Sequence, residues 1–478
     1  MAFPVDDYEV RWKNYKSFVD TGWIKIRPLT IIIGTNNSGK SSVITPLLLM
    51  AQTLSSLDGV TALVTRGPLA NVGRFKDYIH NHKTSDSLFF GFRFHMHVED
   101  TNQKKLKDSS IGRHPPGAIE VTLAKGNSNE ADVKLQQIDF FDVYNRKLWT
   151  QKRLKNGEYS LTGKGIKKLT NKKEVRALKE TSPMNFLFSP AATLRKYEYL
   201  SGDKFSDKQL SKGFSQYLGL TSFAVEELRD VFYSLTYIGP LRERLRRYYE
   251  ISGEMPRAVG TQGEHMANLI RLRYRNNKKL NTWIKRFGFG NKITVKDSSD
   301  VFSLFFKNED ATNEINIADA GFGASQVLPL IVQALAARKR ELIIAEQPEI
   351  HLNPRLQSEL ADLFVDLANE EKRIIVETHS EHMLLRLRRL IAEGEIDHNN
   401  VAIYFVEKQK DIATIRPISV EKNGHISPDE WPKGFFADSL RESLALATAQ
   451  SKAEKTSKLK SSNSRKASKM KKREKRNA

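Results

Sequence analysis

One glycine-rich turn constrains this chain more than any other feature. It begins at Gly34, after the apolar run 29–33, and its sequence Gly-Thr-Asn-Asn-Ser-Gly-Lys-Ser has the spacing Gly-x4-Gly-Lys-Ser. Residues 42–54 then repeat apolar side chains at helical spacing. Such a loop between a strand and a helix is typical of a phosphate-binding loop, or P-loop, so it predicts an α/β nucleotide-binding fold.

The chemistry of this loop predicts ATP and Mg²⁺ as its ligands. Backbone N–H groups of the loop and of the helix N-terminus cradle the β-phosphate. Lys40 reaches the β and γ oxygens as a catalytic residue, and the Ser41 hydroxyl is a metal ligand. The expected nucleotide-binding residues are Gly34, Thr35, Asn36, Asn37, Ser38, Gly39, Lys40, Ser41 and Ser42.

Composition excludes several classes of protein. With 478 residues and a hydrophobic share of 39%, the chain can bury a large core, but it has no apolar run of the roughly 18 residues that span a bilayer. The first residues lack a signal peptide, so we expect a cytoplasmic protein without a membrane role. The absence of cysteine rules out disulfides, thiolate zinc sites and cysteine nucleophiles.

The net charge of +21 indicates a negatively charged partner. Residues 451–478 carry twelve Lys and Arg against two Glu, about half of this excess. Nucleic acid, ribosomes or an acidic protein would each suit such a field. The alternative is a disordered tail that only aids solubility, and the sequence leaves the choice open.

The rest of the chain divides by pattern. Residues 88–98, 118–124 and 133–141 read as strands of an antiparallel sheet, and residues 318–411 alternate helices with β-branched runs, as in a parallel sheet with crossover helices. We expect helices at 223–235 and 264–287. The expected divisions are an N-terminal part of the ATPase core at 1–144, a lysine-rich insertion of unknown fold outside the core at 145–222, the C-terminal part of the core at 223–445, and a basic tail at 446–478.

Two further apolar strands end in polar residues. The segment 341–354 reads as a Walker B strand, with Glu346 as a second metal ligand and Gln347 beside it. The segment 374–380 ends near His379, which we interpret as a sensor of the γ-phosphate or the attacking water. Glu346, Gln347 and His379 are therefore predicted catalytic residues together with Lys40.

A second glycine-rich turn lies at 319–329, where Ser325 opens a predicted helix at 326–337. The free N–H groups of such a helix start form an anion site, to which Gly323 and Ser325 belong. Because the P-loop already holds the phosphates of its own nucleotide, the natural anion for this turn is the γ-phosphate held by another subunit. That arrangement requires a homodimer or a higher oligomer.

With these motifs in this order, the chain resembles ABC-type ATPases, and more closely the RecF/OLD-like group. The resemblance rests on Arg11-Trp-Lys-Asn-Tyr-Lys-Ser-Phe18, Pro348-Glu-Ile-His-Leu-Asn-Pro354 and Glu377-Thr-His-Ser-Glu-His382. Tyr237-Ile-Gly-Pro-Leu-Arg242, Gly263-Glu264 and Trp431-Pro-Lys-Gly-Phe-Phe436 further resemble AAA family ATPases that end in a DUF3696 domain. The expected fold class is α/β, a P-loop ABC-type ATPase head with an antiparallel β subdomain and the lysine-rich insertion.

Many relatives in this group belong to prokaryotic antiviral-defence operons, so the resemblance implies a regulatory ATPase with a separately encoded effector protein. A RecF-like DNA-repair ATPase is the main alternative, and the basic body and tail favour it. An OLD-type nuclease is a second alternative. It requires a Toprim metal site that Glu407 imitates only in part, because no Asp-x-Asp pair follows.

One departure from the usual Asp-Glu-Pro pattern predicts slow chemistry. Gln347 stands where the general base is expected, and an amide cannot accept a proton from water. Glu349 is a candidate substitute, although it belongs to the next turn. We therefore expect slow hydrolysis, with ATP acting mainly to hold two subunits together.

Overall fold

The computed structural model describes residues 5–96, 116–126, 132–163, 171–202, 210–308, 313–427 and 429. Residues 1–425 form one compact unit, to which every element below belongs. The predicted basic tail at 446–478 lies outside the described residues. In the described part of the chain, no helix is long and apolar enough to cross a membrane.

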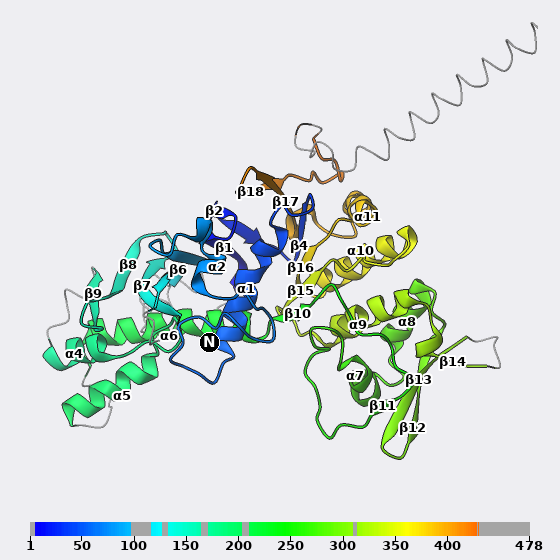
Figure 1. The fold of residues 1–478 in the computed structure, drawn as a ribbon, viewed down its shortest axis with the longest axis horizontal. Coiled ribbons are helices and arrows are strands. Elements are labelled where there is room, and N and C mark those ends of the chain that lie inside the picture. Colours follow the sequence, from blue (N-terminus) through cyan, green and yellow to red (C-terminus); the bar gives the residue numbers. More distant parts are fainter. Residues whose placement is uncertain are drawn as a thin grey trace, which may run out of the picture. The chain divides into compact units, whose positions relative to one another are not determined.

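A six-stranded sheet carries the P-loop. Its strands, in spatial order, are β10 (Thr236–Ile238), β15 (Leu342–Glu346), β16 (Arg373–Glu377), β4 (Leu29–Gly34), β17 (Val401–Gln409) and β18 (Ile412–Ile418). All neighbours pair in parallel except β18, which returns antiparallel to β17. Strand β4, from the start of the chain, thus lies between two strands from its end (Figure 1). Because strands in parallel sheets are covered on both faces, β4 and β16 are buried at every residue.

Helices lie close to the strands of this sheet in the sequence, after β4, β15 and β16 and before β15. They are α1 (Lys40–Leu54), α9 (Phe322–Ala336), α10 (Pro354–Asn369) and α11 (Glu381–Glu393), and a 3₁₀ turn η5 (His398–Asn400) precedes β17. Side chains of Asn353 and Ser380 cap the N-termini of α10 and α11 by accepting backbone N–H groups. The predicted α/β P-loop fold is confirmed.

The predicted antiparallel sheet is also present and is larger than expected. Its path is β2 (Phe18–Asp20), β1 (Val5–Tyr15), β5 (Leu88–Met96), β6 (Pro116–Lys125), β7 (Val133–Asp142), β8 (Lys147–Arg153) and β9 (Tyr159–Gly163), with β3 (Ile24–Ile26) on β1. Trp12 joins this sheet to the P-loop helix, because its indole N–H donates to the Val43 carbonyl at 3.1 Å. Short elements α2 (Phe75–Tyr78) and η1 (His80–His82) precede β5.

The lysine-rich stretch 145–222, expected outside the core, begins within this sheet. Strand β8 pairs with β7, and Trp149 stacks on Phe140 with ring centroids 5.0 Å apart. Only two of the seven residues of β8 are buried, so the alternation that signals a strand is faint in its sequence. Helices α4 (Lys172–Glu180), α5 (Pro190–Ser201) and α6 (Lys212–Tyr233) follow, and the expected border at residue 222 falls within α6.

A third, four-stranded sheet precedes the second glycine-rich turn. It contains β11 (Tyr249–Glu250), β13 (Val301–Lys307), β12 (Lys292–Ser298) and β14 (Ile315–Asn316), followed by η4 (Ile317–Asp319). The helix predicted at 264–287 is two helices, α7 (Met266–Arg273) and α8 (Lys278–Phe287), because Asn277 caps a new N-terminus by accepting the Leu280 N–H. The helix predicted at 326–337 begins four residues earlier, since Gly321 is its N-cap and Gly323 weakens the helical signal.

Candidate functional site

The P-loop links β4 to α1 through a tight turn. An added Cβ at Gly34 would lie 2.3 Å from the Val406 carbonyl oxygen of β17, so only glycine fits there. Gly39 has a φ of 103° and is the N-cap of α1, a conformation that glycine adopts without strain. Thr35, Asn36 and Asn37 are exposed between them. Neighbouring elements therefore fix the loop, while its tip stays open to a ligand.

Lys40 is the first residue of α1 and is 4% exposed. Its ammonium group donates to the Thr35 carbonyl at 2.8 Å and to the Gly34 carbonyl at 3.3 Å. Burial lowers the pKa of Lys40, and the negative charges of nearby glutamates oppose this shift. The ammonium is thus held within the loop. A bound phosphate would offer it charged oxygens in place of these carbonyls.

Two carboxylates meet at the Ser41 hydroxyl. Ser41 Oγ donates to Glu346 Oε1 at 3.1 Å and lies 3.3 Å from Glu377 Oε1. Glu346 and Glu377 are register partners at the ends of the parallel strands β15 and β16. The Tyr237 hydroxyl, from β10, donates to Glu346 Oε2 at 2.6 Å. A hydroxyl and two carboxylates are hard oxygen donors, which fit Mg²⁺.

Sequence reasoning missed Glu377 as a site residue. It ends an apolar strand, as Glu346 does, and that position is the signal that marks it. Burial, followed by the negative charge of Glu346, raises the pKa of Glu377 to about 7. Burial and the hydrogen bond to Glu346 also raise the pKa of Tyr237. An acidic cluster therefore faces the P-loop helix at Ser41.

Gln347 and His379 lie at the same end of the sheet. The Gln347 N–H donates to the Glu377 carbonyl at 2.7 Å, and Gln347 has a φ of 43°. Burial, then the positive charge of Lys40, lowers the pKa of His379, which favours the neutral imidazole at pH 7. Glu349 accepts the His379 backbone N–H at 2.6 Å, and burial raises its pKa. Glu349 thus supports the turn that carries His379.

A cavity of about 660 Å³ gathers most of the predicted residues. It is lined by Lys16, Ser17, Asn36, Asn37, Gly39, Lys40, Ser41, Ser42, Gln347, Glu377, His379 and Lys408. Lys16 and Ser17 come from the turn between β1 and β2, and Lys408 comes from the end of β17. These three residues were not predicted, because long-range contacts bring their segments beside the P-loop: β17 pairs with β4, and the Ala413 N–H of β18 donates to the Ser17 carbonyl. With Lys40, two more ammonium groups face the space that a polyphosphate requires.

The second glycine-rich turn does not line this cavity. Gly321 and Phe322 are exposed, whereas Ser325 is 3% exposed and donates its hydroxyl to the Phe322 carbonyl at 2.6 Å. The Phe322 ring meets His351 edge to face at 4.8 Å. The structure therefore places Gly323 and Ser325 away from the nucleotide pocket of their own chain.

Arg242 connects the turn to the pocket. It is 6% exposed, and its guanidinium donates to Gln326 Oε1 of α9 and to the Glu346 carbonyl, both at 3.2 Å. Burial lowers the pKa of Arg242 to about 10. The arginines that follow it in sequence differ, since Arg244, Arg246 and Arg247 are exposed. Arg242 thus ties α9 to the Walker B strand.

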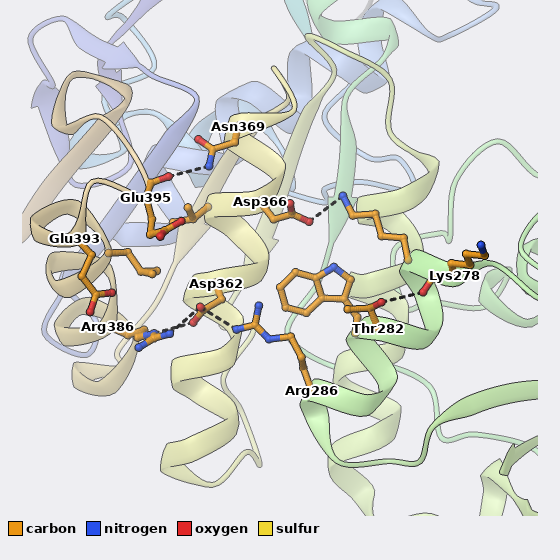
Figure 2. Close-up of a pocket in the computed structure, with 13 residues that line it drawn as sticks. Lys278, Thr282, Arg286, Asp362, Asp366, Asn369, Arg386, Glu393 and Glu395 are labelled. Carbon is orange, nitrogen blue, oxygen red and sulfur yellow. Dashed lines mark hydrogen bonds and ion pairs between the residues drawn. The ribbon is translucent and has the colours of Figure 1, made fainter. Parts of the chain in front are cut away.

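Another cavity, of about 570 Å³, lies between α8, α10 and α11 (Figure 2). Several charges of its lining pair with one another: Asp362 accepts from Arg386 and pairs with Arg286, each at 2.8 Å, and Asp366 pairs with Lys279 at 2.8 Å. Asn369 donates to the Glu395 carbonyl at 2.9 Å. These contacts hold three helices together, and we assign the cavity no ligand.

The acidic cluster makes the stability of the nucleotide-free protein depend on pH. Because Glu377 has a raised pKa, the folded chain binds more protons than the unfolded chain between the ordinary value of 4.5 and about 7. The stability that Glu377 contributes is therefore fully present below this pH window and is lost as the pH rises through it. We expect wild type to lose on the order of 1–3 kcal/mol more than Glu377→Gln between about pH 5 and about pH 8.

Urea denaturation in EDTA measures this difference. The same comparison with Glu371→Gln is the control, because Glu371 is an exposed partner of Lys339 and does not lie in the cluster. Equal pH dependence in wild type and Glu377→Gln would contradict the raised pKa.

Two protein-family models match this chain. The sequence profile described as "AAA ATPase domain" matches residues 9–384, and "Protein of unknown function (DUF3696)" matches residues 396–446. The DUF3696 resemblance predicted from the sequence is thereby confirmed. None of the curated proteins compared with the chain matches its sequence.

Similar solved structures include the SMC head domain from Thermotoga maritima, with 12% identity, a TM-score of 0.36, and coverage of 88% of this chain and 100% of that chain. Another is an Smc head domain with an extended coiled coil bound to the C-terminal domain of ScpA, derived from Pyrococcus furiosus. It has 12% identity and a TM-score of 0.38, and the alignment covers 86% of this chain and 96% of that chain.

Proposed function

Because this chain belongs to the AAA ATPase domain family, we propose that it is a slow ATPase in which ATP holds two copies of the chain together as a switch. ATP would lie in the 660 Å³ cavity, with its phosphates on the P-loop and Lys40. Mg²⁺ would be held at Ser41 and Glu346, where it neutralises phosphate charge. His379, which also lines the cavity, would sense the γ-phosphate.

The observation that carries this proposal is the amide of Gln347. Gln347 lines the cavity directly after the Walker B strand, where the usual motif has a general base. An amide cannot accept a proton from water, so Gln347 cannot act as that base. Glu349 is engaged with the His379 backbone N–H and does not line the cavity. The pocket thus has the groups for binding a polyphosphate but lacks a carboxylate at the usual base position.

The exposed second turn supports a dimer. Phe322 is 43% exposed and Leu241 is 73% exposed, and the Arg244 guanidinium lies 5.9 Å from the Phe322 ring centre. Large apolar side chains beside free helix N–H groups suit a surface that another protein covers. In our proposal a second copy brings its bound γ-phosphate to Gly323 and Ser325.

Turnover measurements test the enzymatic part. Enzymes commonly turn over at about 10 s⁻¹, and we expect well below about 1 s⁻¹ for the full chain at saturating ATP and Mg²⁺. Brisk turnover that Gln347→Ala leaves unchanged would overturn the proposed role of this position. Tight binding of ATP with slow release of ADP supports it.

For the biological role, we propose a regulator that controls a separately encoded effector in antiviral defence. Support comes from the DUF3696 match and from the motif resemblance. The net charge of +21 favours the alternative, a RecF-like repair ATPase on DNA. Two of the exposed arginines are already paired, Arg246 with Glu243 and Arg247 with Asp319. A toxin-like or nuclease-like neighbouring gene supports the defence role, whereas replication or repair neighbours support the alternative.

A further inference from the structure

Glu377 is a buried carboxylate whose position the ATPase proposal leaves unexplained. Its side chain lies at the end of β16, between the Walker B strand and the P-loop strand. It is 1% exposed, yet it lines the nucleotide cavity. Glu377 Oε1 lies near Ser41 Oγ, and Glu377 Oε2 has no hydrogen-bond partner among the described residues.

Such a group is costly unless a ligand satisfies it. A buried carboxylate without a partner loses its hydration, and a like charge beside it adds repulsion. Glu346 supplies that like charge, because parallel pairing sets the two residues side by side. The Lys40 ammonium donates to the loop carbonyls of Gly34 and Thr35. A divalent cation at the Ser41 hydroxyl would compensate both charges at once.

We propose that Glu377 is a second carboxylate ligand of the magnesium ion, which this chain holds with Ser41 Oγ, Glu346 and Glu377. This inference rests on the proposed function, since it concerns the metal that accompanies ATP in the same pocket. Hard cations take carboxylate and hydroxyl oxygens, and a second carboxylate increases affinity for the ion itself. The cation can then bind before the nucleotide and help to position its phosphates.

The neighbouring amide fits this assignment. Gln347 lies next to Glu346 in sequence, and its N–H donates to the Glu377 carbonyl. Because Gln347 is neutral, the residue after Glu346 adds no further negative charge beside the two carboxylates. The chain thus has a carboxylate, Glu377, at the end of β16 and a neutral amide, Gln347, directly after β15. The second carboxylate of the pocket therefore lies at the proposed metal site and not at the usual position of the general base.

Binding of Mn²⁺ to the nucleotide-free full chain tests the assignment, because the free ion is read by electron paramagnetic resonance without any turnover. We expect one Mn²⁺ per chain in wild type. Glu377→Gln should weaken its binding by about 10-fold or more, as Glu346→Gln should. Glu371→Gln, which removes an exposed surface carboxylate, should leave it unchanged.

A second variant and a separate measurement of nucleotide binding complete the test. Glu377→Asp keeps the charge but retracts it by one methylene, so it should bind Mn²⁺ more weakly than wild type and can be read if Glu377→Gln fails to fold. A fluorescent ATP analogue, titrated into the chain in the presence of Mg²⁺, reports nucleotide binding separately. Wild-type binding of the analogue together with equal Mn²⁺ affinity in Glu377→Gln would overturn the metal assignment alone. Lack of analogue binding by wild type, with Mn²⁺ binding lost in Glu377→Gln, would overturn the nucleotide proposal and keep the metal site.

Discussion

Lys40→Met is expected to weaken ATP binding by about 10-fold or more and to lower hydrolysis by a further factor of about 10²–10³. The ammonium of Lys40 is buried within the loop and lies in the same cavity as Ser41, so it has no substitute among the loop side chains. Methionine keeps much of the length and removes the charge. Titration with a fluorescent ATP analogue and a turnover assay measure the two effects.

Two lysines serve as controls for this variant. Lys339→Met removes an exposed ammonium that pairs with Glu371 outside the cavity, and we expect no change in nucleotide binding. Lys408→Met removes an ammonium from the cavity rim that lies 3.8 Å from Asp411, and we expect a smaller loss than for Lys40→Met. Unchanged affinity in Lys40→Met would show that ATP does not bind the P-loop as proposed.

Gln347→Glu is expected to raise the rate of ATP hydrolysis by about 10²-fold, the lower range for adding a positioned general base. Gln347 already lines the cavity, and its backbone is fixed by the hydrogen bond to the Glu377 carbonyl. The new carboxylate would therefore stand beside the γ-phosphate space. Turnover at saturating ATP and Mg²⁺ measures the gain.

Gln409→Glu is the matched control, because it adds the same charge at an exposed position at the end of β17. It should leave the rate unchanged. A brisk wild-type rate combined with no gain in Gln347→Glu would contradict the view that the missing base limits hydrolysis. Loss of Mn²⁺ binding in Gln347→Glu would instead reveal crowding by a third carboxylate.

The sequence was most informative where all the residues of a binding motif lie in one short segment. The P-loop needs only contiguous residues, so β4, the loop and α1 were all predictable from local pattern. Glu346 and His379 were also recognisable, since each follows an apolar strand. The α/β fold followed from these strands and from the helices between them.

Residues that depend on long-range pairing were harder to predict. Glu377 and Lys408 join the cavity because β4 pairs with β16 and β17, whose segments are more than three hundred residues away along the chain. No local pattern specifies that register. Lys16 lies in the β1–β2 turn, where the neighbouring Ser17 carbonyl accepts the Ala413 N–H of β18. Arg242 was also ambiguous in the sequence, because burial separates it from the exposed arginines that follow it.

Irregular burial concealed other elements. Strand β8 has too few buried positions to show alternation, so the sheet was expected to end before the lysine-rich stretch. The start of α9 was hidden by Gly321 and Gly323, which have poor helix propensity. Both errors arose where tertiary contacts, rather than local preference, determine structure.

The mass of the full chain in solution, by sedimentation velocity with a non-hydrolysable ATP analogue and Mg²⁺, shows whether ATP joins two copies. We expect a monomer without nucleotide and a dimer with it. Gly321→Trp should stay monomeric while still binding the analogue, because a Cβ at Gly321 meets only open space at the exposed turn. Gly253→Trp, at another open exposed glycine, should dimerise like wild type. A wild-type chain that stays monomeric when saturated with the analogue would contradict the proposal that ATP joins two copies.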